Sequence, residues 1–151
     1  MSASEIWFYH LERSSLEKTL PPLLERCLAR GWRAIVRGGE AARLAALDEA
    51  IWTFRDESFI PHAIAAGEAA ARQPVLLTAA PGNPNGAQAL FVIDGAALDD
   101  HADFTRTCFL FDGADADALA AARAQWKALK QKGAAISYWR ESGDGKWEKQ
   151  A

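Results

Sequence analysis

The stretch IWFYHLERSSLEKTLPPLLERCLARGWRAIV at residues 6–36 contains the alternation that decides the fold. Residues 6–11 and 32–36 are short aromatic and β-branched runs of the kind found in strands. Between them, leucines at helical spacing predict a helix, which Gly31 is placed to end. A strand, a helix and a second strand in this order favour a mostly parallel sheet covered by helices.

Pro21 and Pro22 lie within this helical pattern. Each proline removes a backbone donor and clashes with the preceding turn, except in the first turn of a helix. We therefore expect either a kink at the prolines or a fresh start near Thr19, whose hydroxyl would cap the free backbone N–H groups.

The rest of the chain continues the alternation. Helical spacing predicts a second helix over about residues 40–52 and a closing helix over about 115–132, while residues 63–72 fit either a short helix or a loop. Further buried-type strands are predicted at 75–78, 90–93, 107–111 and 135–139. These elements indicate a single α/β domain over residues 1–151, with three layers, a mostly parallel central sheet of about five strands and a Rossmann-like shape.

The composition is that of an ordinary globular protein, with 50% hydrophobic and 25% charged residues in a chain suited to one domain. A net charge of −3 argues against a protein that holds nucleic acid over its whole surface, so we expect contact with DNA to be indirect. Cys27 and Cys108 form no CxxC pair, and the chain opens without a signal segment or a membrane-long apolar run. These features favour a cytoplasmic protein with no membrane contact.

Motifs for catalysis and nucleotide binding are absent from the sequence. Neither the dinucleotide fingerprint GxGxxG nor the phosphate loop GxxxxGK[ST] occurs, and there is no GxSxG nucleophile elbow. The three histidines lack a carboxylate partner at a readable spacing, and capping by Asp115 explains the acidic series before the closing helix better than a metal site does. We expect no catalytic residue, no cofactor and no metal. A small enzyme or ligand-binding protein that uses the sheet edge and the loop at residues 82–86 is the alternative.

The stretch LDEAIWTFRDESFIPH at residues 47–62 ends a helix in aromatic residues. Ile51 falls on the core face at helical spacing, and Trp52 adjoins that face. Phe59 falls outside it, on a segment that Pro61 forces out of helical geometry. Rings on a loop fit a docking pocket, but they also fit a satellite core beneath the loop, and both interpretations stay open.

Four residues share neighbouring positions on one face of the closing helix: Arg123, Trp126, Lys127 and Lys130. An aromatic floor ringed by cations suits an acidic peptide that ends in an aromatic residue and a free carboxylate, because Arg can hold the carboxylate in a two-bond fork. In the alternative interpretation, Trp126 belongs to the buried stripe of this helix and the cations are its solvated flank.

Several blocks of the chain resemble, in the same order, the DNA polymerase III chi subunit family: IWFYHL at 6–11, RGWRAIVR at 30–37, LDEAIWTFRDESFIPH at 47–62, FLFDG at 109–113 and ARAQWKALKQKG at 122–133. The resemblance implies a three-layer α/β fold. It also implies a non-catalytic adaptor of the replicative DNA polymerase III holoenzyme, which links the clamp-loader complex, through the psi subunit, to single-stranded DNA-binding protein.

The resemblance further implies a site for the acidic C-terminal tail of single-stranded DNA-binding protein. The positions that match this family site are Trp52, Phe59, Arg123, Trp126 and Lys127. Some family members carry a basic residue where this chain has Leu119, and we expect Lys130 to compensate. The surface for psi cannot be read from motifs; Trp139 and Trp147 are candidates if they are exposed and are core residues otherwise.

Overall fold

One sheet runs through the part of the chain that the computed structural model describes, residues 4–12, 15–53, 60–65, 68–96, 101–141 and 147–150. The helices are α1 (Leu16–Ala29), α2 (Ala41–Trp52), α3 (Glu68–Ala71) and α4 (Ala116–Gln131), with a 3-10 turn at His101–Asp103. The strands are β1 (Glu5–Leu11), β2 (Ala34–Arg37), β3 (His62–Ile64), β4 (Val75–Thr78), β5 (Ala89–Val92), β6 (Arg106–Asp112), β7 (Ala135–Glu141) and β8 (Trp147–Lys149).

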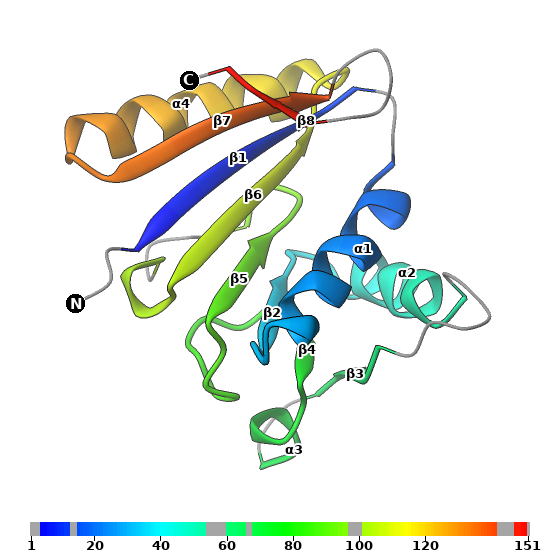
Figure 1. The fold of residues 1–151 in the computed structure, drawn as a ribbon. Coiled ribbons are helices and arrows are strands. Elements are labelled where there is room, and N and C mark those ends of the chain that lie inside the picture. Colours follow the sequence, from blue (N-terminus) through cyan, green and yellow to red (C-terminus); the bar gives the residue numbers. More distant parts are fainter. Residues whose placement is uncertain are drawn as a thin grey trace.

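The strands of the described chain lie in the order β3-β4-β2-β5-β6-β1-β7-β8 (Figure 1). Every neighbouring pair is parallel except β7 and β8, which are antiparallel. Parallel strands need crossover connections, and here α1 connects β1 to β2 while α4 connects β6 to β7. Neither of these pairs lies side by side, because β1 itself separates β6 from β7 and both β5 and β6 separate β2 from β1.

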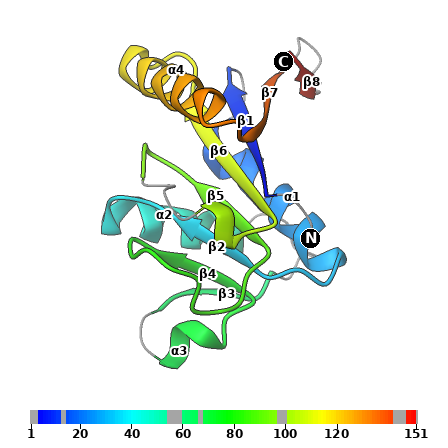
Figure 2. The same ribbon diagram turned by 90° about the vertical axis from the view of Figure 1, so that its left-hand side faces the viewer.

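Alternate residues of β1 belong to two separate cores. Tyr9 and Leu11 pack with residues of α1 and α2, whereas Ile6 and Phe8 pack with residues of α4. Because successive side chains of a strand point to opposite faces, α1 and α2 cover one face of the sheet and α4 covers the other. The view turned by 90° shows α4 standing apart from α1 and α2 (Figure 2). This three-layer α/β arrangement confirms the predicted fold class.

The number of strands differs from the prediction. The described sheet has eight strands where about five were expected, and two of the additional ones are β3 and β8 at its two edges. Each has three residues, which is too short for an alternating pattern to be recognised. The ambiguous segment at residues 63–72 contains most of β3 and the short helix α3.

Helix α1 excludes a fresh start near Thr19, one of the two expectations for the prolines. It runs without a second start from Leu16 to Ala29, with both prolines inside it and with Ser15, not Thr19, at its N-cap position. Thr19 is buried, at 8% exposure, and its hydroxyl has no hydrogen-bond partner in the described structure. The predicted end is confirmed, since Gly31 has φ +78° and the N–H of the next residue donates to the Cys27 carbonyl at 2.9 Å.

The bounds of α2 and α4 agree with the helical spacing to within one residue at each end. Asp115 caps α4, because its Oδ1 accepts from the backbone N–H groups of Asp117 at 3.0 Å and Ala118 at 3.2 Å. Among the described residues, no helix is both long and apolar enough to cross a membrane.

We expect adjacent substitutions at the end of α2 to differ sharply in their effect on stability. Ile51 is 3% exposed and lies in the core beneath α2, so Ile51→Ala should lower the free energy of unfolding by about 2–5 kcal/mol. Trp52 is 54% exposed, so Trp52→Ala should cost less than half of that. Urea denaturation of both variants checks this, provided that the free energy of unfolding falls with urea concentration at the same slope in both. Equal losses would place Trp52 in the core.

Candidate functional site

Helix α4 divides into a buried side and a cationic side. Ala122 and Leu129 are buried against the sheet at 1% and 4% exposure. Arg123, Lys127 and Lys130 are exposed, and within the described residues none of them forms an ion pair. We call these three residues the α4 cationic face. Their charges are available to an anionic partner.

Trp126 lies between these two sides of α4. Its ring packs edge-on against Phe8, with centroids 5.4 Å apart, and against Tyr138, with centroids 5.6 Å apart. The indole is half-buried and packs against the core beneath α4. Trp126 therefore packs partly with the buried stripe of α4 and also borders the α4 cationic face.

A buried histidine and a tyrosine adjoin this face. Nδ1 of His10 and the hydroxyl of Tyr138 are 2.7 Å apart. Burial lowers the pKa of His10 and raises the pKa of Tyr138, and the positive charge of Arg123 lowers both. A neutral imidazole and a protonated phenol therefore share this hydrogen bond, and the tautomer of His10 decides which of the two donates.

Arg140 and Glu12 complete the surroundings of this pair. Nε of Arg140 donates to Oε1 of Glu12 at 2.7 Å, and Glu12 Oε1 lies 3.6 Å from Nε2 of His10. Tyr138 and Arg140 come from β7, and His10 comes from the neighbouring strand β1, where it pairs in register with Arg140. No local pattern in the sequence points to these residues, because only the pairing of β1 with β7 brings them beside α4.

Trp52 lies elsewhere on the molecule. It ends α2, which contacts β3 and β4, whereas α4 contacts β6 and β7 on the opposite face of the sheet (Figures 1 and 2). The ring of Trp52 lies 4.6 Å from the ring of His62, and Ile64 nearby on β3 is 48% exposed. The structure therefore does not bring Trp52 together with the α4 residues, which corrects the expected single pocket. Phe59 lies outside the described residues.

Trp139 and Trp147 have intramolecular ring contacts. Trp139 stacks on Trp7 with centroids 5.1 Å apart, and Trp147 meets Tyr9 edge-on with centroids 5.0 Å apart. Both are partly buried against the core on the side of α1 and α2. This favours the interpretation of both tryptophans as packing residues.

A cavity of about 790 Å³ lies where α/β proteins commonly bind ligands. It lies at the carboxyl ends of β1 and β6, which are neighbouring strands. The helix after β1 is α1 and the helix after β6 is α4, and these two helices pack on opposite faces of the sheet. Its lining includes six carboxylates and one arginine: Glu12, Glu17, Asp94, Asp112, Asp115, Asp117 and Arg43. Arg43 pairs with Glu17 and, at 3.2 Å, with Asp94. Such a lining repels phosphate groups, which disfavours a nucleotide ligand.

His62 and the two cysteines are buried in the fold. His62 is 6% exposed, with Nε2 3.2 Å from Oδ1 of Asp48. Both cysteines are buried, and burial raises the pKa of the Cys27 thiol to about 11. In the described ranges, no group of three or more potential ligands is arranged to hold a metal ion.

We expect Gly113→Ala to disturb the His10–Tyr138 pair. A Cβ at Gly113 would lie 1.9 Å from Nε2 and 2.2 Å from Cδ2 of His10, so the imidazole must move. Overpacking of this kind should lower the free energy of unfolding by about 1–3 kcal/mol. Gly39→Ala is the matched control, because a Cβ there meets nothing within 4 Å. Urea denaturation and the NMR shifts of the His10 ring measure the two effects. An unchanged ring in Gly113→Ala would contradict the close approach.

Comparisons with known proteins identify the family of this chain. The family model described as "DNA polymerase III chi subunit, HolC" matches residues 3–137. The chain is also similar to a protein of Rickettsia prowazekii (strain Madrid E) named "Probable DNA polymerase III subunit chi", with 27% identity over 85 residues. That match covers 56% of this chain and 52%, about half, of the relative's length. Because the family model spans residues 3–137 of 151, this chain belongs to the DNA polymerase III chi subunit family.

Proposed function

We propose that this protein is a non-catalytic cytoplasmic adaptor of the DNA polymerase III holoenzyme. In this proposal the α4 cationic face binds the acidic C-terminal tail of single-stranded DNA-binding protein, and a second surface binds psi and through it the clamp-loader complex. Membership of the chi family supports a role within the polymerase III assembly. The single observation that carries the tail site is the set of three exposed cations on one face of α4, without ion-pair partners in the described structure.

The chemistry of the α4 cationic face suits such a tail. Arg123 would hold the terminal carboxylate with two parallel hydrogen bonds, because the guanidinium is planar and its donors match the two carboxylate oxygens. Lys127 and Lys130, four and seven residues further along the same face, would attract the acidic residues that precede it. The exposed part of Trp126 would receive the terminal aromatic ring. A rigid helix holds these groups in place before the partner arrives.

The second surface in this proposal is the exposed apolar pair of Trp52 and Ile64. These are the large hydrophobic side chains with the greatest exposure in the described structure, at 54% and 48%. Exposed apolar side chains of this size are enriched in protein interfaces. Since they lie at the β3 edge, away from α4, psi and the tail could bind at the same time. Simultaneous binding is what an adaptor requires.

We expect the chain to bind a peptide that has several acidic residues and a terminal Phe carboxylate. Amidation of the peptide terminus should weaken binding by about 1–3 kcal/mol, the value of a charge-assisted hydrogen bond. In Arg123→Ala the free and amidated peptides should bind alike, because the fork is gone. Lys127→Ala should weaken both, and Trp52→Ala should change neither. Calorimetry at two salt concentrations measures these affinities. Equal binding of the two peptides by the unsubstituted protein would refute carboxylate capture by Arg123.

The participation of Phe59 in the tail site stays a prediction, since this residue lies outside the described part of the chain. Phe59→Ala belongs in the same calorimetric series. A loss of affinity comparable to that of Lys127→Ala would extend the tail site beyond α4. An unchanged affinity would confine the site to that helix.

We expect the isolated protein not to hold naked single-stranded DNA at physiological salt. Its net charge is −3, and phosphate binding gains its strength from many cations acting together. Binding should appear once single-stranded DNA-binding protein coats the strand, and it should disappear when the acidic tail of that protein is removed. Fluorescence anisotropy of a labelled oligonucleotide measures both states. Micromolar binding of the naked strand would contradict indirect contact.

A further inference from the structure

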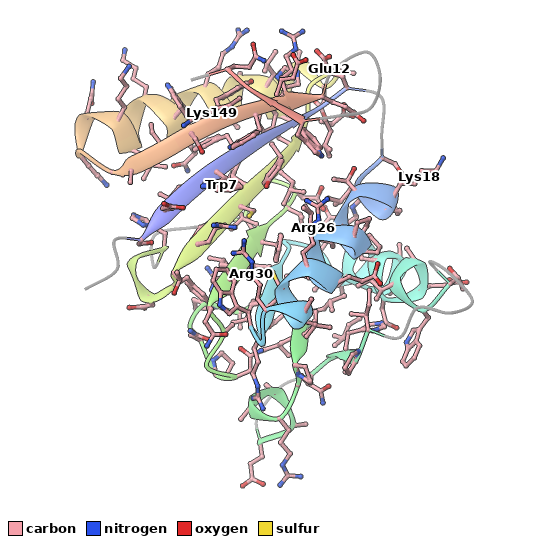
Figure 3. The ribbon with its side chains drawn as sticks, viewed as in Figure 1. Trp7, Glu12, Lys18, Arg26, Arg30 and Lys149 are labelled. Carbon is pink, nitrogen blue, oxygen red and sulfur yellow. The ribbon has the colours of Figure 1, made fainter. Side chains whose placement is uncertain are left out.

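A second groove, lined by aromatic rings and arginines, lies on the face of the sheet opposite α4. It has a volume of about 380 Å³ and is bounded by α1 on one side and by β1, β5 and β6 on the other. Figure 3 shows Trp7 on β1 and Arg26 and Arg30 on α1 along this part of the molecule. We call it the aromatic–arginine groove. None of the residues implied for the tail site or the psi surface lines it.

The floor of the aromatic–arginine groove is apolar. Phe91 and Cys108 are buried at its base, with exposures of 2% and 3%, and the half-buried rings of Trp7 and Trp32 form walls. Pockets of a few hundred Å³ lined in this way bury one or more apolar groups of a ligand. The floor therefore suits a large aliphatic or aromatic side chain.

Arginines at the rim are oriented by the rings. The guanidinium of Arg106 lies 4.0 Å from the ring centroid of Trp7 and 5.5 Å from that of Trp32, and the guanidinium of Arg30 lies 5.1 Å from the ring of Trp32. Stacking on a ring face leaves the edge N–H donors of a guanidinium for other partners. Arg106 also forms an ion pair with Glu5, with Nη2 3.8 Å from Oε2. The rim thus presents oriented positive charge above an apolar floor.

Arg26 and Tyr9 add to this character. Arg26 is exposed in the last turn of α1, Arg30 directly follows the helix, and neither forms an ion pair within the described residues. Tyr9 lines the groove at 6% exposure, and its hydroxyl makes no hydrogen bond to any described residue. Burial raises the pKa of Tyr9, so the hydroxyl keeps its proton and can donate. Because this hydroxyl is not fully buried, water or a ligand in the groove can accept from it.

We propose that the aromatic–arginine groove binds an acidic peptide segment that inserts one large apolar side chain and places an adjacent carboxylate against Arg30 and Arg106. Charge complementarity selects an anionic partner, and the apolar floor selects one with a large side chain beside the charge. A nucleic acid strand fits less well, because bases need open ring faces to stack on. Trp7 is covered from the β6 side by Arg106 and from the β7 side by Trp139, whose ring centroid is 5.1 Å away.

The test uses the full chain and the blocked peptide acetyl-DEFED-amide, which has no terminal carboxylate. Calorimetry and tryptophan fluorescence measure its affinity, with acetyl-DEAED-amide and acetyl-NQFQN-amide as controls for the ring and the charges. Arg30→Ala and Arg106→Gln should each weaken binding by about 10-fold to 100-fold, and Tyr9→Phe by about fivefold. Arg72→Ala, a matched loss of one exposed charge next to α3, should leave the affinity unchanged. Thermal unfolding of each variant shows that it is folded.

Lys127→Ala separates this site from the α4 cationic face and should not change the affinity for the blocked peptide. The proposal is overturned if Arg30→Ala and Arg106→Gln bind as well as the unsubstituted chain, or if Arg72→Ala weakens binding equally. It is also overturned if Lys127→Ala removes binding, which would place the peptide on α4. An oligonucleotide of mixed sequence can be added as a competitor of the peptide. If it displaces the bound peptide at a lower concentration than free peptide does, the groove binds nucleic acid instead. The tail site on α4 can stand or fall independently of these results.

Discussion

The pairing of β1 with β6 and β7 is the constraint on which the rest of this structure depends. Residues 5–11 pair in parallel with residues 106–112 on one edge and with residues 135–140 on the other. A strand in this position has its backbone groups satisfied on both edges and its side chains buried on both faces. β1 continues into α1 on one face and its neighbour β6 continues into α4 on the other, which creates two cores around a single strand.

This arrangement explains how one helix can serve both the core and a partner. In α4, the residues that face the sheet are small or apolar. The cations lie three and four residues apart from one another on the other side of the helix, at Arg123, Lys127 and Lys130. Trp126 occupies the boundary, held edge-on by Phe8 from β1 and Tyr138 from β7. The α4 cationic face is therefore presented by a helix whose orientation is determined by core packing, and little ordering is left to be done on binding.

Local separation of charge matters more in this protein than its net charge of −3. Carboxylates gather in the cavity at the carboxyl ends of β1 and β6, whereas arginines gather at the other end of α1, around Trp7 and Trp32. Exposed charges act mainly within a Debye length, which is about 8–10 Å at physiological salt. A weakly acidic chain can therefore still present two separate cationic surfaces.

The sequence by itself determined the elements whose signal is local. Leucine spacing predicted α1, and helical periodicity with Gly31 and Asp115 predicted where helices end or begin, because capping and periodicity act over a few residues. The buried position of Ile51 followed from the same periodicity. The three exposed cations of α4 were also readable, since they depend on the 3.6-residue turn alone.

Tertiary structure alone decided everything that depends on distant pairing. The edge strands β3 and β8 exist because a neighbouring strand supplies their partners, and three residues carry too little pattern to show this. Trp52 and Trp126 looked like walls of one pocket, but crossover connections place α2 and α4 on opposite faces. His10 and Tyr138, and likewise Trp7 and Arg106, meet across strands separated by about a hundred residues or more. Such contacts are created by strand register, which no local signal in the chain specifies.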